Sequence, residues 1–162
     1  MSVTDIHKDP GQLTMTVVTE LDAPPDRAWQ LWADPRKLER WWGPPTYPAT
    51  FVDHDLTPGG RCSYYMTGPG GDRPHGWWRI VAVDAPHSLE LEDGFADEHG
   101  APSDGMPVMV MRVEFTDRPG GCTMTLVTRY ASLADMERVI EMGMEEGIRS
   151  AVDQIDGILA GD

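Results

Sequence analysis

Four polar side chains could orient a small molecule, although none of them belongs to a recognised catalytic motif. His54 lies on an apolar strand face, and Tyr64 and Arg112 alternate with apolar neighbours in runs of the same kind. His75 precedes two tryptophans in "PHGWWRIVAVD". A few polar groups in an otherwise apolar pocket fix the orientation of many small ligands. We therefore predict all four as ligand-binding candidates, with a satisfied core histidine as the competing interpretation of His54.

Motifs for covalent, metal or nucleotide chemistry are absent from the sequence. It has no Gly-x-Ser-x-Gly elbow, no His-Glu-x-x-His, and no Gly-Lys-Ser/Thr after its glycine clusters. The histidines show no metal-ligand spacing, and Cys62 and Cys122 are predicted to be free thiols. We therefore name no catalytic residue and expect no metal and no cofactor. The acidic stretch 89–100 is predicted to be a strand end and a solvated loop, with a hidden acid–base pair as the alternative.

Two tandem tryptophan pairs each have to serve two directions. In "RKLERWWGPP", Trp41 follows Leu38 by three positions, which predicts a core residue that anchors a short helix. Trp42 then points elsewhere, toward a presumed cavity mouth, and is a candidate for ligand contact. In the second pair, strand alternation sends Trp77 and Trp78 to opposite faces. The sequence does not decide which face is inside; Trp77, which shares its face with a candidate histidine, is named as a ligand-binding candidate.

Missing side-chain volume in the C-terminal segment also suggests a cavity. Gly143 and Gly147 lie one turn apart inside a helical pattern, where each costs about 1 kcal/mol relative to alanine. Either the helix kinks or packs closely at this point, or Gly147 leaves room for a ligand. Methionines are also frequent, and Met109 and Met144 are candidates for a flexible lining that adapts to several ligands.

The elements that would position these residues follow from hydrophobic periodicity and turn chemistry. Alternation over 13–21 predicts a strand, and helical spacing from Pro24 predicts two short helices with Asp34 as the second N-cap. Between 47 and 130, three Pro-Gly-Gly turns separate six short apolar runs, which predicts an antiparallel meander. An apolar stripe from 133 to 159, with Ser132 as N-cap, predicts one long helix. A bent sheet filled by such a helix leaves a cavity between them.

Length and charge limit the classes of partner. The chain has 162 residues, and 27 acidic against 13 basic residues give a formal charge of -14. This balance argues against binding to nucleic acid or to an anionic membrane surface. No apolar run approaches the ~20 residues of a membrane helix, so no membrane insertion is expected. We predict a single domain over 1–162, with a core at about 13–159, and a cytoplasmic location, since no secretory signal is evident.

Three segments resemble a known superfamily. "LDAPPDRAWQLWADPRKLERWWGP", "VDHDLTPGGRC" and "EMGMEEGIRSAVDQIDGIL" are similar to the START/Bet v 1-like (SRPBCC) superfamily, and within it to the group of activator of heat-shock-protein-90 ATPase homologues. The resemblance implies an α+β helix-grip fold. In this fold a bent seven-stranded antiparallel sheet, with two short helices after strand 1, wraps around a long C-terminal helix and encloses a cavity. Relatives include lipid and hormone carriers, polyketide aromatase/cyclases and the chaperone co-activator.

Three functions remain as hypotheses. The first is binding of a small hydrophobic molecule, aromatic or polyketide- or lipid-like, between the sheet and the C-terminal helix. The second is a cyclase- or hydrolase-type enzyme that works in the same cavity. The third is a chaperone co-activator or a stress-related interaction module, for which the chaperone would be the partner. The sequence leaves monomer and homodimer open.

Overall fold

The computed structural model describes residues 3–161, which form one eight-stranded sheet and five helices. The sheet order is β1-β2-β8-β7-β6-β5-β4-β3, and each neighbouring pair is antiparallel. The strands are β1 Val3–Asp9, β2 Thr14–Leu21, β3 Ala49–His54, β4 Arg61–Met66, β5 His75–Asp84, β6 Ser88–Ala96, β7 Val108–Arg118 and β8 Gly121–Arg129. The helices are α1 Pro25–Ala33, α2 Pro35–Leu38, α3 Leu133–Glu141, α4 Met144–Val152 and α5 Ile155–Gly161.

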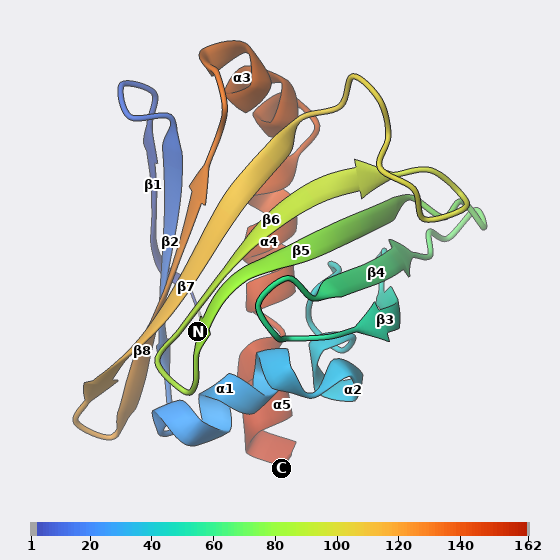
Figure 1. Cartoon of the computed structure of the whole chain (residues 1–162). Helices are drawn as coiled ribbons and strands as arrows, with labels where there is room; N and C mark the ends of the chain where they lie inside the picture. Colours follow the sequence, from blue (N-terminus) through green and yellow to red (C-terminus); the bar gives the residue numbers. More distant parts are fainter. Residues whose placement is uncertain (1–2, 162) are drawn as a thin grey trace.

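The predicted α+β architecture is confirmed. Figure 1 shows a curved sheet with α4 and α5 running along one face, while α1 and α2 lie near α5 at one end of the sheet. The predicted Pro-Gly-Gly turns are also confirmed, because Gly59, Gly71 and Gly120 all adopt φ values above +80°. Two of these turns join β3 to β4 and β4 to β5 near one edge of the sheet, and the third joins β7 to β8.

The strand count was one too low, because β1 was not predicted. This strand pairs with β2 at the edge of the sheet, through a turn in which Leu13 has φ 58°. The segment contains aspartates, a histidine and a lysine, which are unusual in a half-buried strand. Within it, Ile6 packs against the core, so one apolar contact replaces the alternating pattern that sequence analysis needs.

The prediction of a single long C-terminal helix was also wrong, because three consecutive helices, α3, α4 and α5, form there. Gly143 has φ 91°, which ends the helical path after Met142 and places a glycine at the N-cap of α4. A second interruption follows at residues 153–154. The apolar stripe nevertheless stays on one side, because Ile148, Ile155 and Leu159 are all buried. The breaks preserve the phase of the stripe, and for this reason periodicity alone could not reveal them.

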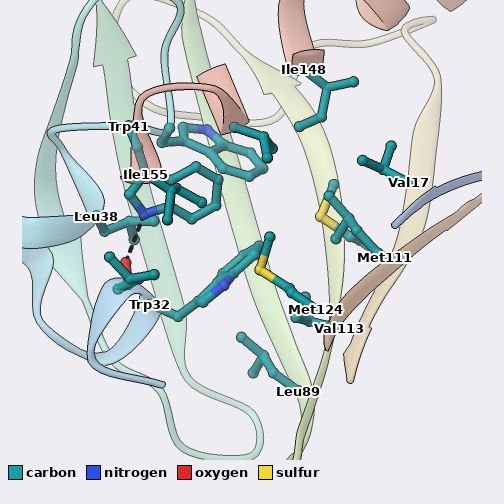
Figure 2. Packing of buried hydrophobic residues seen from close by; sticks show 14 of the residues in the cluster. Val17, Trp32, Leu38, Trp41, Leu89, Met111, Val113, Met124, Ile148 and Ile155 are labelled. Atoms are coloured by element: carbon teal, nitrogen blue, oxygen red, sulfur yellow. Dashed lines mark hydrogen bonds between the residues drawn. The ribbon is translucent and has the colours of Figure 1, made fainter. Parts of the chain in front are cut away.

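Two N-terminal helices form as predicted, but α2 ends at Leu38, so Trp41 and Trp42 enter the core from the turn after it and not from the helix. Asp34 caps α2 by accepting a hydrogen bond from the Arg36 N–H at 2.9 Å. Trp32 from α1 lies edge-on to Trp41, with 4.9 Å between ring centroids, and both are fully buried (Figure 2). Trp78 from β5 lies 5.9 Å from Trp32, so the cluster joins the helices to the concave face of the sheet.

Candidate functional site

An apolar pocket opens between the concave face of the sheet and the junction of α3 with α4. We call it the sheet–helix pocket; its volume is about 240 Å³. Strands β4, β6 and β7 contribute Tyr64, Met66, Asp93, Phe95, Met109 and Met111. The helices and the segment after α2 contribute Trp42, Pro44, Val139, Met142, Gly143, Met144, Gly147 and Ile148. The pocket is therefore apolar apart from one carboxyl group and one phenol.

The two glycines at the helix junction create part of this space. Gly143 adopts the left-handed conformation that turns the chain from α3 into α4. Gly147 lies in the first turns of α4, and a Cβ placed on it would meet no atom within 4 Å. Close packing against another element therefore does not explain Gly147. A longer side chain at this position would extend into open space along the pocket wall.

Asp93 and Tyr64 form the polar end of the pocket. The Tyr64 hydroxyl donates to Asp93 Oδ1 at 3.3 Å, and Asp93 is buried, with only 8% of its surface exposed. Trp78 lies directly opposite Asp93 in the pairing of β5 with β6. The Trp78 indole N–H makes no hydrogen bond of normal geometry, yet it acts on the carboxyl group as a nearby donor. Tyr64 thus donates one hydrogen bond to the carboxyl group, and the unpartnered Trp78 N–H lies nearby.

Burial shifts the proton equilibria of this pair. Loss of water raises the pKa of Asp93 to about 7, against the smaller lowering effects of the Tyr64 hydroxyl and the Trp78 N–H. The pKa of Tyr64 lies well above its ordinary value, first because the phenol is buried and second because Asp93 is acidic. Asp93 therefore exchanges a proton near neutral pH, whereas Tyr64 keeps its proton and acts as a donor.

The position of Tyr64 depends on a glycine in the next strand. Gly76 is the register partner of Tyr64, and a Cβ on Gly76 would overlap the Tyr64 ring and hydroxyl. The other side of the ring stacks on Phe51 at a centroid distance of 5.0 Å, and Trp42 meets it edge-on at 6.1 Å. Packing on both sides holds the phenol beside the carboxyl group of Asp93.

The structure brings together five of the nine predicted site residues. Trp42, Tyr64, Met109, Met144 and Gly147 all line the sheet–helix pocket. His75 lies in a smaller adjoining pocket of about 110 Å³ that shares Tyr64 and Asp93 with the first. Its Nδ1 atom lies 2.7 Å from the Arg73 carbonyl oxygen.

The remaining three predicted residues lie outside the pocket. His54 Nε2 is 2.9 Å from the Trp32 carbonyl oxygen. This contact agrees with the competing interpretation of His54 as a core histidine whose hydrogen bond is made within the protein. Trp77 faces the opposite side of the sheet from the buried Trp78, and its indole N–H donates to the Phe95 carbonyl. Arg112 is also on the outer side of the sheet, where it contacts one acidic side chain on the neighbouring strand and another on its own strand. Alternation alone could not assign these faces.

Asp93 is the functional candidate that sequence analysis missed. The acidic stretch from residue 89 to 100 is a strand end and a loop, as predicted, because β6 continues to Ala96 and a turn follows, but the burial of Asp93 was not predicted. A signal was present: Leu89, Leu91 and Asp93 alternate along one strand face, and all three are buried. An acidic residue in phase with two leucines predicts a buried carboxyl group. The expectation that the acidic residues face solvent left this alternation unused.

Other features of the described chain do not add to the site. Cys62 and Cys122 are free and buried, as predicted. Within residues 3–161, no group of three or more histidines, cysteines or acidic residues is placed to hold a metal ion. None of the helices in this range is long and apolar enough to cross a membrane.

A curved antiparallel sheet, helices along its concave face and an apolar pocket between them define a helix-grip domain. The chain belongs to the family described as Activator of Hsp90 ATPase homolog 1-like protein, whose family model matches residues 22–160. This range includes every residue that lines the pocket. A comparison with curated proteins finds no match.

Solved structures from bacteria are similar over almost the whole chain. Protein Ms6760 from Mycobacterium smegmatis is 50% identical, with a TM-score of 0.90, and the alignment covers 97% of this chain and 96% of that one. A protein from Arthrobacter aurescens is 46% identical, with a TM-score of 0.95 and coverage of 99% and 94%. The AHSA1 protein SPO3351 from Silicibacter pomeroyi shares the fold at 24% identity, with a TM-score of 0.71 and coverage of 91% and 97%.

Proposed function

We propose that this protein binds a small, mainly apolar molecule in the sheet–helix pocket. The observation that carries the proposal is the space beside Gly147, where neither a side chain nor a neighbouring element fills the gap between helix and sheet. A helix interior would gain about 1 kcal/mol from alanine in place of glycine. An unfilled volume kept at that cost is consistent with a ligand that occupies it.

The lining supports a ligand that is defined by shape and apolarity. Met66, Met109, Met111, Met142 and Met144 are five of the pocket residues. Methionine side chains are flexible and polarizable, so they fit the surfaces of differently shaped apolar molecules. Burial of the apolar part of a ligand would supply the affinity, at roughly 25 cal/mol for each Å² removed from water.

Filling the pocket from the helix side tests the proposal. We expect Gly147→Leu to reduce binding of the neutral fluorescent probe N-phenylnaphthylamine at least about tenfold, because the new side chain takes up the ligand's volume. Gly147→Ala adds a single methyl group and should retain most of the binding. Fluorescence titration gives the affinities, and thermal unfolding shows whether each variant remains folded.

Gly157→Leu is the matched control for this substitution. Gly157 lies in α5, is exposed, and also has no atom within 4 Å of a Cβ, but it does not line the pocket. This variant makes the same change in a helix and should bind the probe as the unmodified protein does. Equal probe binding by Gly147→Leu and Gly157→Leu, with both variants folded, would contradict a ligand site at this pocket.

An enzymatic role in the same pocket is the second candidate, and Asp93 is the observation that favours it. A carboxyl group with a pKa of about 7 is suited to take and return protons near neutral pH. Tyr64 would serve as the neighbouring donor. This function requires turnover of a bound substrate that Asp93→Asn abolishes while binding is kept; binding without turnover leaves the carrier function.

A further inference from the structure

Asp93 gives the pocket a specific chemical preference beyond apolarity. Building on the proposed binding function, we propose that the pocket selects molecules in which an apolar body carries an ammonium group, and that this cation pairs with the Asp93 carboxylate. The apolar body would lie against the methionines and the wall beside Gly147, with the ammonium group at the Tyr64–Asp93 end.

The hydrogen-bonding groups around Asp93 are arranged for its charged form. Tyr64 donates to Oδ1, and the Trp78 indole N–H on the neighbouring strand, which has no hydrogen-bond partner of its own, lies close enough to favour the charged form. Donors stabilise a carboxylate, whereas a protonated carboxyl group would need an acceptor for its own hydrogen. The surroundings thus prepare Asp93 for a negative charge, although burial without a partner opposes that charge.

The part of the chain that the structure describes places no lysine or arginine beside this charge, and the one basic side chain nearby is His75 in the adjoining pocket. Among the described residues that line the sheet–helix pocket and the adjoining pocket, there is no lysine and no arginine. Buried charges in proteins are generally paired, because an isolated ion loses its hydration without compensation. A ligand that brings its own positive charge would form this pair, and the attraction between the two charges would offset the cost of removing the carboxylate from water.

The aromatic rings of the pocket favour the same ligand class. Trp42, Tyr64 and Phe95 line the pocket together with Asp93. Aromatic faces attract organic cations, and the attraction grows when water is excluded. An anionic amphiphile would meet the repulsion of Asp93 and would find no lysine or arginine among the described residues of the pocket wall, so a fatty-acid-like ligand is disfavoured.

Three probes of nearly equal shape separate charge from apolarity. Phenylbutylamine, phenylbutanol and phenylbutyrate have the same apolar body with a cationic, a neutral or an anionic end. We expect the amine to bind at least about tenfold more tightly than the alcohol, and the carboxylate to bind most weakly. Isothermal titration calorimetry at pH 8 measures the three affinities on the intact chain.

Proton linkage gives a second readout. Because pairing requires the carboxylate, amine affinity should fall as pH decreases below about 7, while alcohol affinity should stay constant. Tyr64 and His75 are the other titratable side chains that line the two pockets in the described chain; α3 and α4 present Val139, Met144 and Ile148 there, which do not titrate. His75→Gln is the control for the second of these side chains. Because we assign the pH dependence to Asp93, this variant should retain it.

Substitutions at the polar end identify the group responsible. Asp93→Asn should bring the ratio of amine to phenylbutanol affinity to about one and remove the pH dependence of amine binding. Tyr64→Phe should weaken amine binding less than Asp93→Asn, because it removes one donor to the carboxylate and keeps the charge. Tyr64→Phe also serves as the test variant if Asp93→Asn does not fold.

The outcomes distinguish this inference from the binding function on which it depends. If phenylbutanol binds as tightly as the amine, or if Asp93→Asn keeps the amine preference, the pocket binds apolar molecules but the ammonium preference is wrong. If none of the three probes binds, the proposed binding function itself is contradicted for ligands of this size.

Discussion

Replacing Asp93 with asparagine is expected to stabilise the protein at and above neutral pH and to leave its stability near pH 4 almost unchanged. The pKa of this carboxyl group rises from 3.8 in the unfolded chain to about 7 in the folded protein. The folded state therefore binds more protons than the unfolded state between these values, and this group's stabilisation is lost as pH increases through that range. The shift corresponds to about 4 kcal/mol of unfolding free energy.

Urea unfolding at several pH values from about 4 to about 8 measures this effect. The difference in unfolding free energy between Asp93→Asn and the unmodified protein should increase steadily toward about 4 kcal/mol as pH rises, and then level off above pH 7. Taking the difference cancels the contributions of the other carboxyl groups. A constant difference over the whole range would contradict the raised pKa of Asp93, and with it the burial of an unpaired carboxyl group.

Asp97 is a control of opposite sign, four positions further along the chain. Its carboxyl group accepts hydrogen bonds from the backbone N–H groups of His99 and Ala101, and these lower its pKa. The contribution of Asp97 is thus present at neutral pH and is lost as pH falls. Asp97→Asn should therefore destabilise the protein at neutral pH, and this loss should disappear on acidification, whereas Asp93→Asn should stabilise the protein at neutral pH.

The sequence could predict elements wherever one local rule decides the structure. The cap at Asp34, the glycine turns at Gly59 and Gly120, and the apolar faces of the central strands each follow from residues a few positions apart. The choice between faces is different in kind. Trp77 and Trp78 alternate perfectly, but only the packing of Trp78 on Trp32 shows which of them is inside.

The site depended on such long-range choices, so it was predicted only in part. Trp42 and Gly147 reach one pocket from segments about a hundred residues apart, and each carried a local signal of its own. Asp93 carried a signal as well, in its phase with Leu91, but the surrounding acidic residues suggested a solvated strand end. The prediction that places Arg112 in the pocket was wrong. Its strand alternates apolar and polar residues, and the sequence does not show that the polar ones face water.

The tandem tryptophans should respond differently to the same substitution. We expect Trp41→Phe to lower the unfolding free energy by about 2 to 4 kcal/mol and Trp42→Phe to lower it by about 1 kcal/mol or less. Both residues are buried, with 0% and 6% of their surface exposed, so burial alone would predict similar losses. The difference lies in the hydrogen bonds of the two indole groups.

The Trp41 indole N–H replaces a missing helical donor. It donates to the Leu31 carbonyl at 2.9 Å (Figure 2), which in a continuous helix would accept from residue 35. That residue is Pro35, which has no N–H. Trp41→Phe would leave a buried carbonyl without this donor and open a cavity in the tryptophan cluster. The Trp42 N–H, by contrast, makes no hydrogen bond of normal geometry; it lies near the Tyr64 hydroxyl, at the pocket and not in a helix end.

The substitution at Trp42 should act on the pocket instead of on the fold. Its ring lines the sheet–helix pocket and meets Tyr64 edge-on, so a phenyl ring in its place widens the space available to a ligand. Chemical unfolding gives the stabilities, and titration with N-phenylnaphthylamine gives the affinities. Trp42→Phe should change probe affinity with little loss of stability, and Trp41→Phe should do the opposite wherever the protein stays folded. Equal stability losses without any change in probe affinity would mean that both tryptophans serve only the core.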